Sequence, residues 1–457
     1  MLKVFLLHPI FETYFTYEAP IGIAYLKTIC QRKGHQVEVL DNNVMQLSEE
    51  EILQKLKGFD VLGISMTTPT YKAVKSLSER VRKELGIPVI IGGAHPTSDP
   101  IDTLEFADYI VLNEAEEVFP KMLELMESGK AVPEELKKIR GIGFHAEGKK
   151  ILTEKSEQLT DLDAIPFPDW HGFPLEKYGS ALRVSGRCLP IVTSRGCPYT
   201  CVYCYKGLFG WKVRTRSAKN VVDELEYLKN EFGIKEFQIA DDVFNMFEDH
   251  AVGVCKEMIE RKIDLPWALP NGIRATQVTD NLAYWMKKAG LQYTGLGVET
   301  GNQELMNTIG KVQTKEQVRE AVKTLKRHKI QVVGFFIFGL PGETEQTMKE
   351  TIDFALSLDL DYYSISMATP YPGTKLYNML KEGKGTMLTK NMEDLFSLGS
   401  KCKYTMPGMA SPEKIEEMYK KARMKLLLRP KTIMQNITKP KRLIAGAKVA
   451  YKWILKT

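Results

Sequence analysis

The chain has 457 residues, a formal net charge of +6 and a hydrophobic fraction of 44%, which is typical of a soluble globular protein with more than one domain. It holds no run of about 18 apolar residues, so no membrane-spanning helix is expected. The N-terminus lacks the cleavage site of a secretory signal. Four of the seven cysteines stand alone, which argues against a disulfide framework. We therefore expect a cytoplasmic protein in a reducing compartment.

Short apolar runs alternate with amphipathic stretches in the first third of the chain. The strand candidates are 3–8, 36–40, 60–65, 88–93 and 108–112, and the helix candidates between them are 21–33, 49–57 and 71–85. Nearly continuous apolar strands separated by helices indicate a parallel sheet covered on both faces. The pattern predicts a doubly wound, Rossmann-like α/β domain over residues 1–135. The stretch 136–185, rich in Pro, Gly and aromatic residues, is interpreted as a linker.

A second series of strands and helices follows this stretch. The strand candidates are 189–194, 236–240, 266–272, 293–299, 332–339 and 362–368. The helix candidates are 218–231, 249–262, 279–289, 302–309, 315–328 and 345–358. Six such units predict a partial (β/α)6 barrel over residues 186–375, with its chemistry at the carboxyl ends of the strands. Residues 376–457 are expected to form a small helical C-terminal region.

Three cysteines crowd into the sequence SRGCPYTCVYC, directly after the first barrel strand. They are Cys197, Cys201 and Cys204. A loop of this length can wrap three thiolates around one iron–sulfur cube and leave the fourth iron open. A structural zinc ion would need a fourth ligand, and the nearest candidate, Cys188, stands at the far end of the strand. A non-catalytic zinc module nevertheless stays an alternative at this point.

The CxxxCxxC spacing, with Tyr203 before the last cysteine, resembles the signature of the radical S-adenosylmethionine (SAM) superfamily. The resemblance implies that the three cysteines hold a 4Fe-4S cluster whose open iron binds SAM. An external one-electron donor such as flavodoxin or ferredoxin would reduce this cluster. Cleavage of SAM would then give a 5′-deoxyadenosyl radical, which abstracts hydrogen from an unactivated carbon.

Further residues at successive strand ends fit the same superfamily. The resemblance assigns SAM binding to Tyr203, Asp241, Asp242, Arg274, Glu299 and Gly339. The two aspartates suit the SAM ammonium group. Glu299 suits the ribose hydroxyls or the amino-acid moiety, and Gly339 lets the backbone approach the adenine. Taken alone, each residue could instead cap a helix or turn the chain.

The first domain resembles a cobalamin-binding domain, and the order of domain, linker and cysteine motif resembles radical SAM enzymes fused to one. The resemblance assigns cobalamin binding to Ser65, Thr67, Gly92, Gly93, His95, Asn113 and Glu114. Two features depart from the pattern. The cobalt-ligand motif DxHxxG is missing after the first strand, and NEAEE at 113–117 replaces the usual Gly-Glu-Gly-Glu. A histidine ligand to cobalt is therefore in doubt, and a cobalamin-free radical SAM enzyme with a degenerate first domain stays an alternative.

The resemblance implies two uses of SAM, one as methyl donor to cobalamin and one as radical source. We predict a cobalamin-dependent C-methyltransferase acting on a small apolar substrate, lipid-like or a natural product. The same relatives include radical cyclases or oxidases of the tetrapyrrole type, which the cysteine motif does not separate. An enzyme that methylthiolates tRNA is a weaker candidate. That class carries three further cysteines in its first domain, whereas residues 1–180 hold only Cys30.

The basic residues gather at the C-terminal end of the chain. From Lys420 to Thr457 the sequence has twelve Lys or Arg and no Asp or Glu. Residues 439–457 have a helical period with apolar and lysine faces, which favours contact of the stretch 432–457 with anionic lipid at a membrane surface. A helix docked on the barrel is the alternative, and nucleic acid is not the expected partner. The expected location is therefore the cytoplasm, with a peripheral contact to the membrane.

Overall fold

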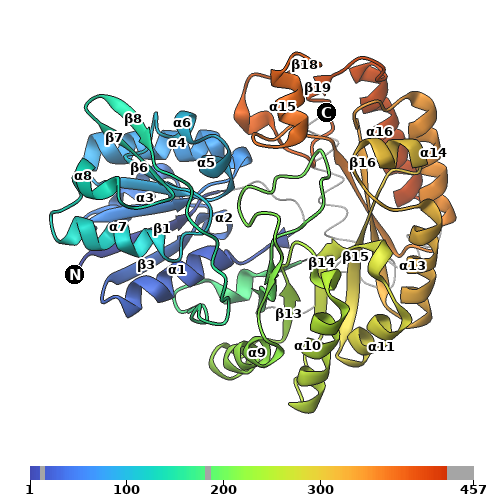
Figure 1. The fold of residues 1–457 in the computed structure, drawn as a ribbon, viewed down its shortest axis with the longest axis horizontal. Helices are drawn as coiled ribbons and strands as arrows, with labels where there is room; N and C mark the ends of the chain where they lie inside the picture. Colours follow the sequence, from blue (N-terminus) through green and yellow to red (C-terminus); the bar gives the residue numbers. More distant parts are fainter. Residues whose placement is uncertain (11–15, 181–186, 430–457) are drawn as a thin grey trace.

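The computed structural model describes residues 1–10, 16–180 and 187–429. Two α/β lobes lie side by side, and a smaller region in orange adjoins the carboxyl edge of the second lobe (Figure 1). The architecture confirms the predicted fold class, a doubly wound domain followed by a partial barrel. Most predicted strands and helices start and end within two residues of the observed bounds.

The first lobe contains a seven-stranded sheet in the order β3-β1-β4-β5-β6-β7-β8. Its strands are β1 (Lys3–His8), β3 (Gln36–Asp41), β4 (Val61–Ser65), β5 (Val89–Gly92), β6 (Tyr109–Val111), β7 (Ile142–Ala146) and β8 (Lys149–Leu152). The strands from β3 to β6 are parallel, and the chain order reverses between β1 and β4. Such a reversal opens a crevice at the carboxyl edge of a parallel sheet.

Helices cover both faces of this sheet. They are α1 (Ile21–Arg32), α2 (Asn42–Met45), α3 (Glu49–Leu56), α4 (Tyr71–Arg80), α5 (Ala94–Ser98), α6 (Pro100–Thr103), α7 (Val118–Glu127) and α8 (Pro133–Leu136). Alternate residues of β1 point to opposite faces. Val4 and Leu6 pack with α1 and α7, whereas Phe5 and Leu7 pack with α3 and α4. Burial on both sides explains why the sequence of β1 is apolar without alternation.

Strands β7 and β8 lie within the stretch 136–185 that sequence analysis interpreted as a linker. They pair antiparallel with β6 and with each other, so the first sheet extends to Leu152. The sequence KKIL of β8 is only partly buried, and it lacks the continuous apolar run of the inner strands. Pairing with β6 therefore defines these edge strands more than their own composition does. Further along the chain, β9 (Gly179–Ser180) pairs antiparallel with β2 (Thr16–Tyr17), which lies near the N-terminus.

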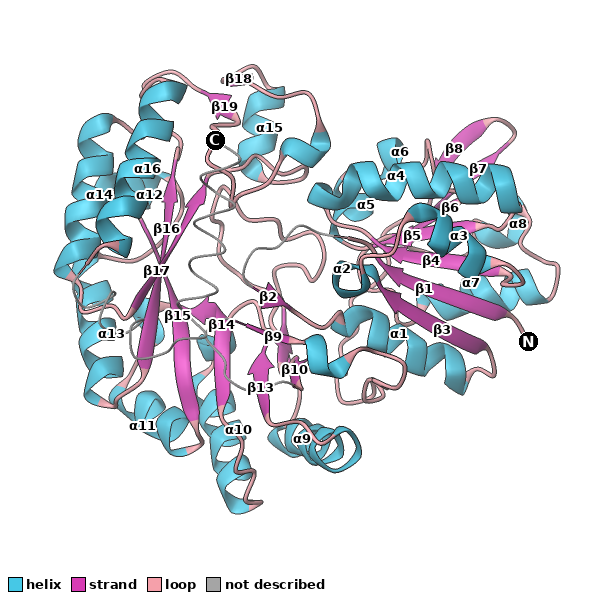
Figure 2. Ribbon diagram, turned by 180° about the vertical axis from the view of Figure 1, so that it is seen from behind, coloured by secondary structure: helices cyan, strands magenta, loops and turns pink. Residues whose placement is uncertain are grey.

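The second lobe contains six parallel strands that neighbour one another in chain order. They are β10 (Cys188–Ile191), β13 (Glu236–Ile239), β14 (Trp267–Ile273), β15 (Leu291–Glu299), β16 (Gln331–Phe338) and β17 (Tyr362–Met367). The helices are α9 (Ala218–Phe232), α10 (Glu248–Glu260), α11 (Asp280–Lys288), α12 (Gln303–Thr308), α13 (Lys315–Arg327) and α14 (Glu345–Ser357). Helices lie along the outer side of the strands (Figure 2). All six strands bring their carboxyl ends to one edge.

The C-terminal region mixes helix and strand. It holds α15 (Lys375–Lys381), η6 (Met392–Asp394), the antiparallel pair β18 (Thr386–Met387) and β19 (Tyr404–Thr405), and α16 (Pro412–Leu427). Helix α16 packs on the barrel, where the Tyr419 hydroxyl donates to the Ile365 carbonyl at 3.3 Å. The amphipathic stretch 432–457 lies outside the described residues. Within the described ranges, no helix is both long enough and apolar enough to cross a bilayer.

Candidate active site

The three clustered cysteines lie in the loop between β10 and α9, at the carboxyl edge of the barrel. We call residues 192–217 the cluster loop. The strands β11 (Ser194–Arg195) and β12 (Arg214–Thr215) pair at its base. Gly196 has a φ of +94°, and a Cβ there would lie 2.4 Å from the Lys212 carbonyl oxygen. Only glycine therefore permits the turn that leads into Cys197.

Two backbone hydrogen bonds hold the cluster loop against the barrel and the C-terminal region. The Val202 N–H donates to the Ile309 carbonyl at 3.0 Å, and the Leu376 N–H donates to the Val202 carbonyl at 2.9 Å. The loop is therefore fixed in the middle of its cysteine motif as well as at its base.

The thiols sit next to a lysine cation. Cys197 is buried, whereas Cys201 and Cys204 are partly exposed. Burial alone would lower the pKa of Lys206, but the thiols of Cys204 and Cys197 and the Asp242 carboxylate raise it above its usual value. Burial raises the pKa of Cys204, and Lys206 opposes this shift. Two of the thiols therefore lie beside Lys206, and Cys201 lies near Cys204. Three thiols in one loop with a nearby cation are a donor set that fits a negatively charged iron–sulfur cluster.

The structure separates the two aspartates that were predicted to bind SAM. The Asp241 carboxylate is buried and accepts hydrogen bonds from the Thr193 N–H at 2.7 Å and from the Thr193 and Ser194 hydroxyls. Burial raises its pKa to about 6, against the opposing effect of these hydrogen bonds. Asp242 is exposed and accepts a hydrogen bond from the Gly196 N–H at 3.2 Å. Asp241 therefore links the ends of β10 and β13 through its hydrogen bonds. The Asp242 carboxylate can still accept hydrogen bonds from a ligand.

Glu299 ends β15 in a left-handed conformation, with a φ of +68°. Such backbone strain in a non-glycine residue is common at functional sites. Its carboxylate is buried and pairs with Lys311 at 2.7 Å. Burial and this carboxylate raise the pKa of the Tyr203 phenol well above its usual value. Glu299 and Tyr203, which are far apart in the sequence, therefore meet beside Cys204.

Arg274, after β14, lies under the cluster loop. Its guanidinium stands 3.4 Å from the centroid of the Tyr199 ring, and its Nη2 donates to the Val312 carbonyl at 2.8 Å. Its Nε is buried without a hydrogen-bond partner among the described residues. Arg274 thus supports the cysteine motif from below and keeps one donor for a ligand.

Gly339, after β16, is held by two neighbouring side chains. Its N–H donates to the Glu343 carboxylate, and its carbonyl accepts from the Tyr404 hydroxyl at 2.6 Å. Burial raises the pKa of Glu343 to about 8, although the N–H groups of Gly339 and Leu340 lower it. The backbone at this strand end is therefore rigid, which suits the docking of a flat ring such as adenine.

Four of the predicted cobalamin residues, Ser65, Thr67, Gly92 and Gly93, lie at the carboxyl edge of the first sheet, beside the reversal of strand order. Ser65 ends β4 opposite Gly92, which ends β5. Gly93 has a φ of +111°, and a Cβ there would lie 2.7 Å from the Met66 carbonyl oxygen. Thr67 is exposed. Small residues at this edge leave the space that a large ligand needs, so the residues fit cobalamin.

His95 lies behind this edge. It is fully buried. Its Nδ1 shares a hydrogen bond with the Thr68 hydroxyl at 3.1 Å, and its ring packs edge-on against Tyr71. Burial lowers its pKa to about 4. His95 is thus a neutral histidine packed between η1 (Thr68–Thr70) and α4. Its Nε2 is buried without a hydrogen-bond partner among the described residues, and its contact with cobalamin stays a prediction.

Asn113 and Glu114 were also predicted to contact cobalamin, but the structure turns both toward the cluster loop. The Asn113 side-chain amide donates to the Gly207 carbonyl. The Glu114 carboxylate accepts from Arg195 at 2.8 Å and from Arg214 at 2.7 Å. The Glu114 carboxylate is therefore committed to a contact between the lobes. The Asn113 Oδ1 is buried without a partner in the described chain, and it remains able to accept from a ligand.

Sequence reasoning missed three charged residues of this region: Arg195, Lys206 and Lys311. Arg195 and Lys206 stand within two residues of the cysteine motif, so proximity was an available signal. Lys311 carries no such signal, because it reaches Glu299 only through the packing of the loop after α12.

Matches to known proteins agree with this geometry. The family model of the Radical SAM superfamily matches residues 191–355, and that of the B12 binding domain matches residues 7–123. An uncharacterized methyltransferase of Pyrococcus horikoshii is 31% identical, over 92% of this chain and 90% of its own length. An anaerobic magnesium-protoporphyrin IX monomethyl ester cyclase of Rubrivivax gelatinosus is 30% identical over 79% of this chain and 66% of its own length.

A solved structure shows the same fold at low sequence identity. It is the radical SAM methyltransferase TsrM from Kitasatospora setae, with cobalamin and a 4Fe-4S cluster bound. Its TM-score is 0.71 at 18% identity, and the match covers 94% of this chain and 89% of that chain.

The fold and the matches define a radical SAM enzyme. The chain belongs to the family of radical SAM enzymes that carry a cobalamin-binding domain. The cofactors of this family are a 4Fe-4S cluster, SAM and cobalamin, as predicted. The zinc-module alternative is therefore set aside, and so is the cobalamin-free one.

Proposed function

We propose that the enzyme is a cobalamin-dependent C-methyltransferase that acts on an unactivated carbon of a small, largely apolar molecule. The observation that carries the proposal is the meeting of the two lobes at the cluster loop. Asn113 follows β6 at the cobalamin edge and contacts Gly207, three residues after Cys204. This contact turns the carboxyl edge of the first sheet toward the cysteine motif. Transfer between two cofactors requires such proximity.

When bound, the cofactors supply the methyl group and the radical that removes a substrate hydrogen. The residues of this chain hold and orient them. We assign the cluster to Cys197, Cys201 and Cys204, with Lys206 offsetting its negative charge. We assign SAM to Asp242, Glu299, Arg274, Tyr203 and the backbone at Gly339, and cobalamin to Ser65, Thr67, Gly92 and Gly93. Asp241 and Glu114 shape the site without touching a cofactor.

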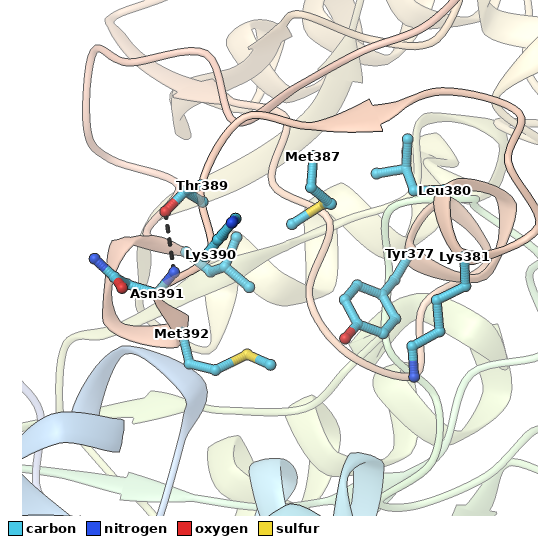
Figure 3. A pocket seen from close by; sticks show the side chains of 9 residues that line it. Tyr377, Leu380, Lys381, Met387, Thr389, Lys390, Asn391 and Met392 are labelled. Carbon is cyan, nitrogen blue, oxygen red and sulfur yellow. Dashed lines mark hydrogen bonds between the residues drawn. The ribbon is translucent and has the colours of Figure 1, made fainter.

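A cavity in the C-terminal region supports an apolar substrate. It has a volume of about 180 Å³ and lies between α15 and η6, with apolar lining from Tyr377, Leu380, Met387, Met392 and Leu395. Lys381 and Lys390 add cations at its wall (Figure 3). Helix α15 is bonded at its start to the cluster loop, through Leu376 and Val202. The lining suits an apolar body with an acidic group.

Radical cyclisation of a tetrapyrrole is the second candidate. The similarity to a relative named as a cyclase favours it, but the chain spans only about two thirds of that relative's length. The match to a relative named as a methyltransferase extends over 90% of that protein. The coverage therefore favours methyl transfer. A small flavodoxin or ferredoxin is the proposed electron donor for either reaction.

SAM carrying a trideuterated methyl group tests the proposal. The enzyme would be reconstituted anaerobically with iron, sulfide and cobalamin, and supplied with a chemical reductant and candidate apolar acids. We expect products heavier by one CD3 group in place of one hydrogen. We also expect one S-adenosylhomocysteine and one 5′-deoxyadenosine for each product, because methyl donation and radical formation each consume one SAM.

The balance of SAM products distinguishes the candidates. Formation of 5′-deoxyadenosine with a ring-closed or oxidised product that contains no deuterium would replace methyl transfer by the cyclase reading. The same protein reconstituted without cobalamin is the control, and it should form no methylated product.

We also propose that the stretch 432–457 contacts anionic membrane lipid, because its six Lys and Arg residues have no acidic neighbour within it. The full-length protein is expected to sediment with vesicles containing phosphatidylglycerol but not with neutral vesicles. A chain ending at residue 431 should lose this binding. Equal sedimentation of both chains would contradict the proposal.

A further inference from the structure

The base of the cluster loop brings two arginines together. Arg195 in β11 stands directly opposite Arg214 in β12, and both side chains are about 95% buried. Like charges that face each other across a strand pair repel, and a low dielectric strengthens the repulsion. The hairpin at the base of the cluster loop therefore needs nearby negative charge to be stable.

That negative charge comes from the first lobe. The two oxygens of Glu114 accept separately from Arg195 at 2.8 Å and from Arg214 at 2.7 Å. Glu116 accepts from the other terminal nitrogen of Arg195 at 2.6 Å. Two cations and two carboxylates thus form one balanced network across the junction of the lobes. The two arginines of the cluster loop are therefore paired with these carboxylates only when the first lobe is docked on the loop.

Aromatic rings enclose the network. The Arg195 guanidinium lies 5.8 Å from the centroid of Tyr25 in α1 and 5.1 Å from that of Phe209 in the cluster loop. Rings close to the guanidinium help to shield the ion pairs from water, which strengthens these pairs relative to exposed ones. One ring comes from each lobe, so this shielding also depends on docking.

The network connects the carboxyl edge of the first sheet to the cysteine motif through a few residues on each side. Glu114 directly follows Asn113, whose N–H donates to the Thr97 hydroxyl of α5 at 2.9 Å. At the other end, Arg195 stands two residues before Cys197. A displacement of the first lobe would therefore pull on the turn that starts the cysteine motif.

We infer that Glu114 and Glu116 are positioning residues, which act through Arg195 and Arg214 to hold the cobalamin-carrying lobe at a fixed distance from the iron–sulfur cluster. The inference rests on the proposed function. Neither carboxylate contacts a cofactor in this role. Removing one charge leaves a buried cation incompletely paired, which favours opening of the junction.

The test compares Glu116→Gln with Glu117→Gln. The first substitution removes one network charge but leaves Arg195 paired with Glu114, so the protein should fold. The second is the matched control, because Glu117 is exposed and, within the described part of the chain, pairs at the surface with Lys121 at 3.8 Å. Arg195→Lys is the third variant, since one ammonium keeps the charge but does not bridge both carboxylates as a guanidinium does.

We expect Glu116→Gln to retain iron, cobalamin and SAM binding but to form about tenfold less methylated product per 5′-deoxyadenosine, in the range of coupling between linked sites. Arg195→Lys should lower the product ratio by a similar factor. Because the two residues act through one contact, the double variant Glu116→Gln/Arg195→Lys should lower the ratio no further than either single variant. Glu117→Gln should match the wild type. A product ratio for Glu116→Gln equal to that of the control would overturn the inference.

Two readouts do not depend on methyl transfer. In the cofactor-free protein, hydrogen exchange of the cluster-loop amides should speed up in Glu116→Gln and not in the control. In the loaded protein, the magnetic interaction between reduced cluster and cob(II)alamin should weaken. If the wild type forms no methylated product, the proposed function fails, but these readouts still decide the inference. Unchanged exchange and unchanged coupling would reject it.

Discussion

Serine at Cys197, Cys201 or Cys204 is expected to remove the iron–sulfur cluster and with it all reductive cleavage of SAM. A serine hydroxyl is a poor iron ligand at neutral pH, because it stays protonated where a thiol ionises. Each variant should contain little iron after anaerobic reconstitution, and formation of 5′-deoxyadenosine should fall by roughly three orders of magnitude or more. Iron analysis, absorbance near the charge-transfer band of the cluster, and chromatography of the nucleoside measure these effects.

Cys30→Ala provides the matched control for the cysteine variants. Cys30 is fully buried in α1 of the first lobe, and alanine replaces it with little change in volume. This variant should bind four irons and cleave SAM as the wild type does. Retention of a full cluster in any of the three serine variants would show that another residue completes the ligand set.

Valine at Gly92 is expected to weaken cobalamin binding while the iron–sulfur cluster remains. Gly92 ends β5, and a Cβ there would meet only Val111, at 3.8 Å. The protein itself therefore has room for the first atom of a side chain, and a β-branched residue suits a strand. The bulk would instead project toward the bound ligand. Overpacking of this kind should weaken cobalamin binding by at least about tenfold.

Cobalamin absorbance and iron content after desalting measure the effect at Gly92. The contrast with Gly93→Ala separates ligand contact from backbone strain, because a Cβ at Gly93 would meet the Met66 backbone itself. Gly93→Ala should lower the thermal stability of the first lobe, whereas Gly92→Val should not. Full cobalamin occupancy in Gly92→Val would show that cobalamin does not bind against the end of β5.

The local sequence pattern predicted much of the fold. The apolar runs of β1, β4 and β5 and the helical periods between them are properties of short segments, and parallel strands must place their carboxyl ends at one edge. The cysteine motif is also local, since eight residues hold all three thiols. These features could be predicted because none of them depends on which distant segment packs nearby.

The partners of individual polar groups could not be predicted in this way. Asp241 and Asp242 are neighbours in the sequence. The Asp241 carboxylate nevertheless accepts hydrogen bonds from Thr193 and Ser194 at another strand end, whereas Asp242 stays exposed. Glu114 stands in the segment that was expected to face cobalamin, but its partner Arg195 lies 81 residues further along the chain. Strands β7 and β8 were missed for a related reason. Their apolar pattern is weak, and they form strands because β7 pairs with β6 and β8 pairs with β7.

The sequence by itself therefore determined the two-lobed α/β architecture, the cysteine motif and the cofactor class of this enzyme. Short-range periodicity encodes the architecture and local spacing defines the cysteine motif, whereas the cofactor class followed from the resemblance of these motifs to a known family. Only the tertiary structure decided which carboxylates remain available to a ligand and which form the ion pairs that hold the lobes together. The physical reason is that a buried charge must be paired, and packing alone determines which distant residue becomes its partner.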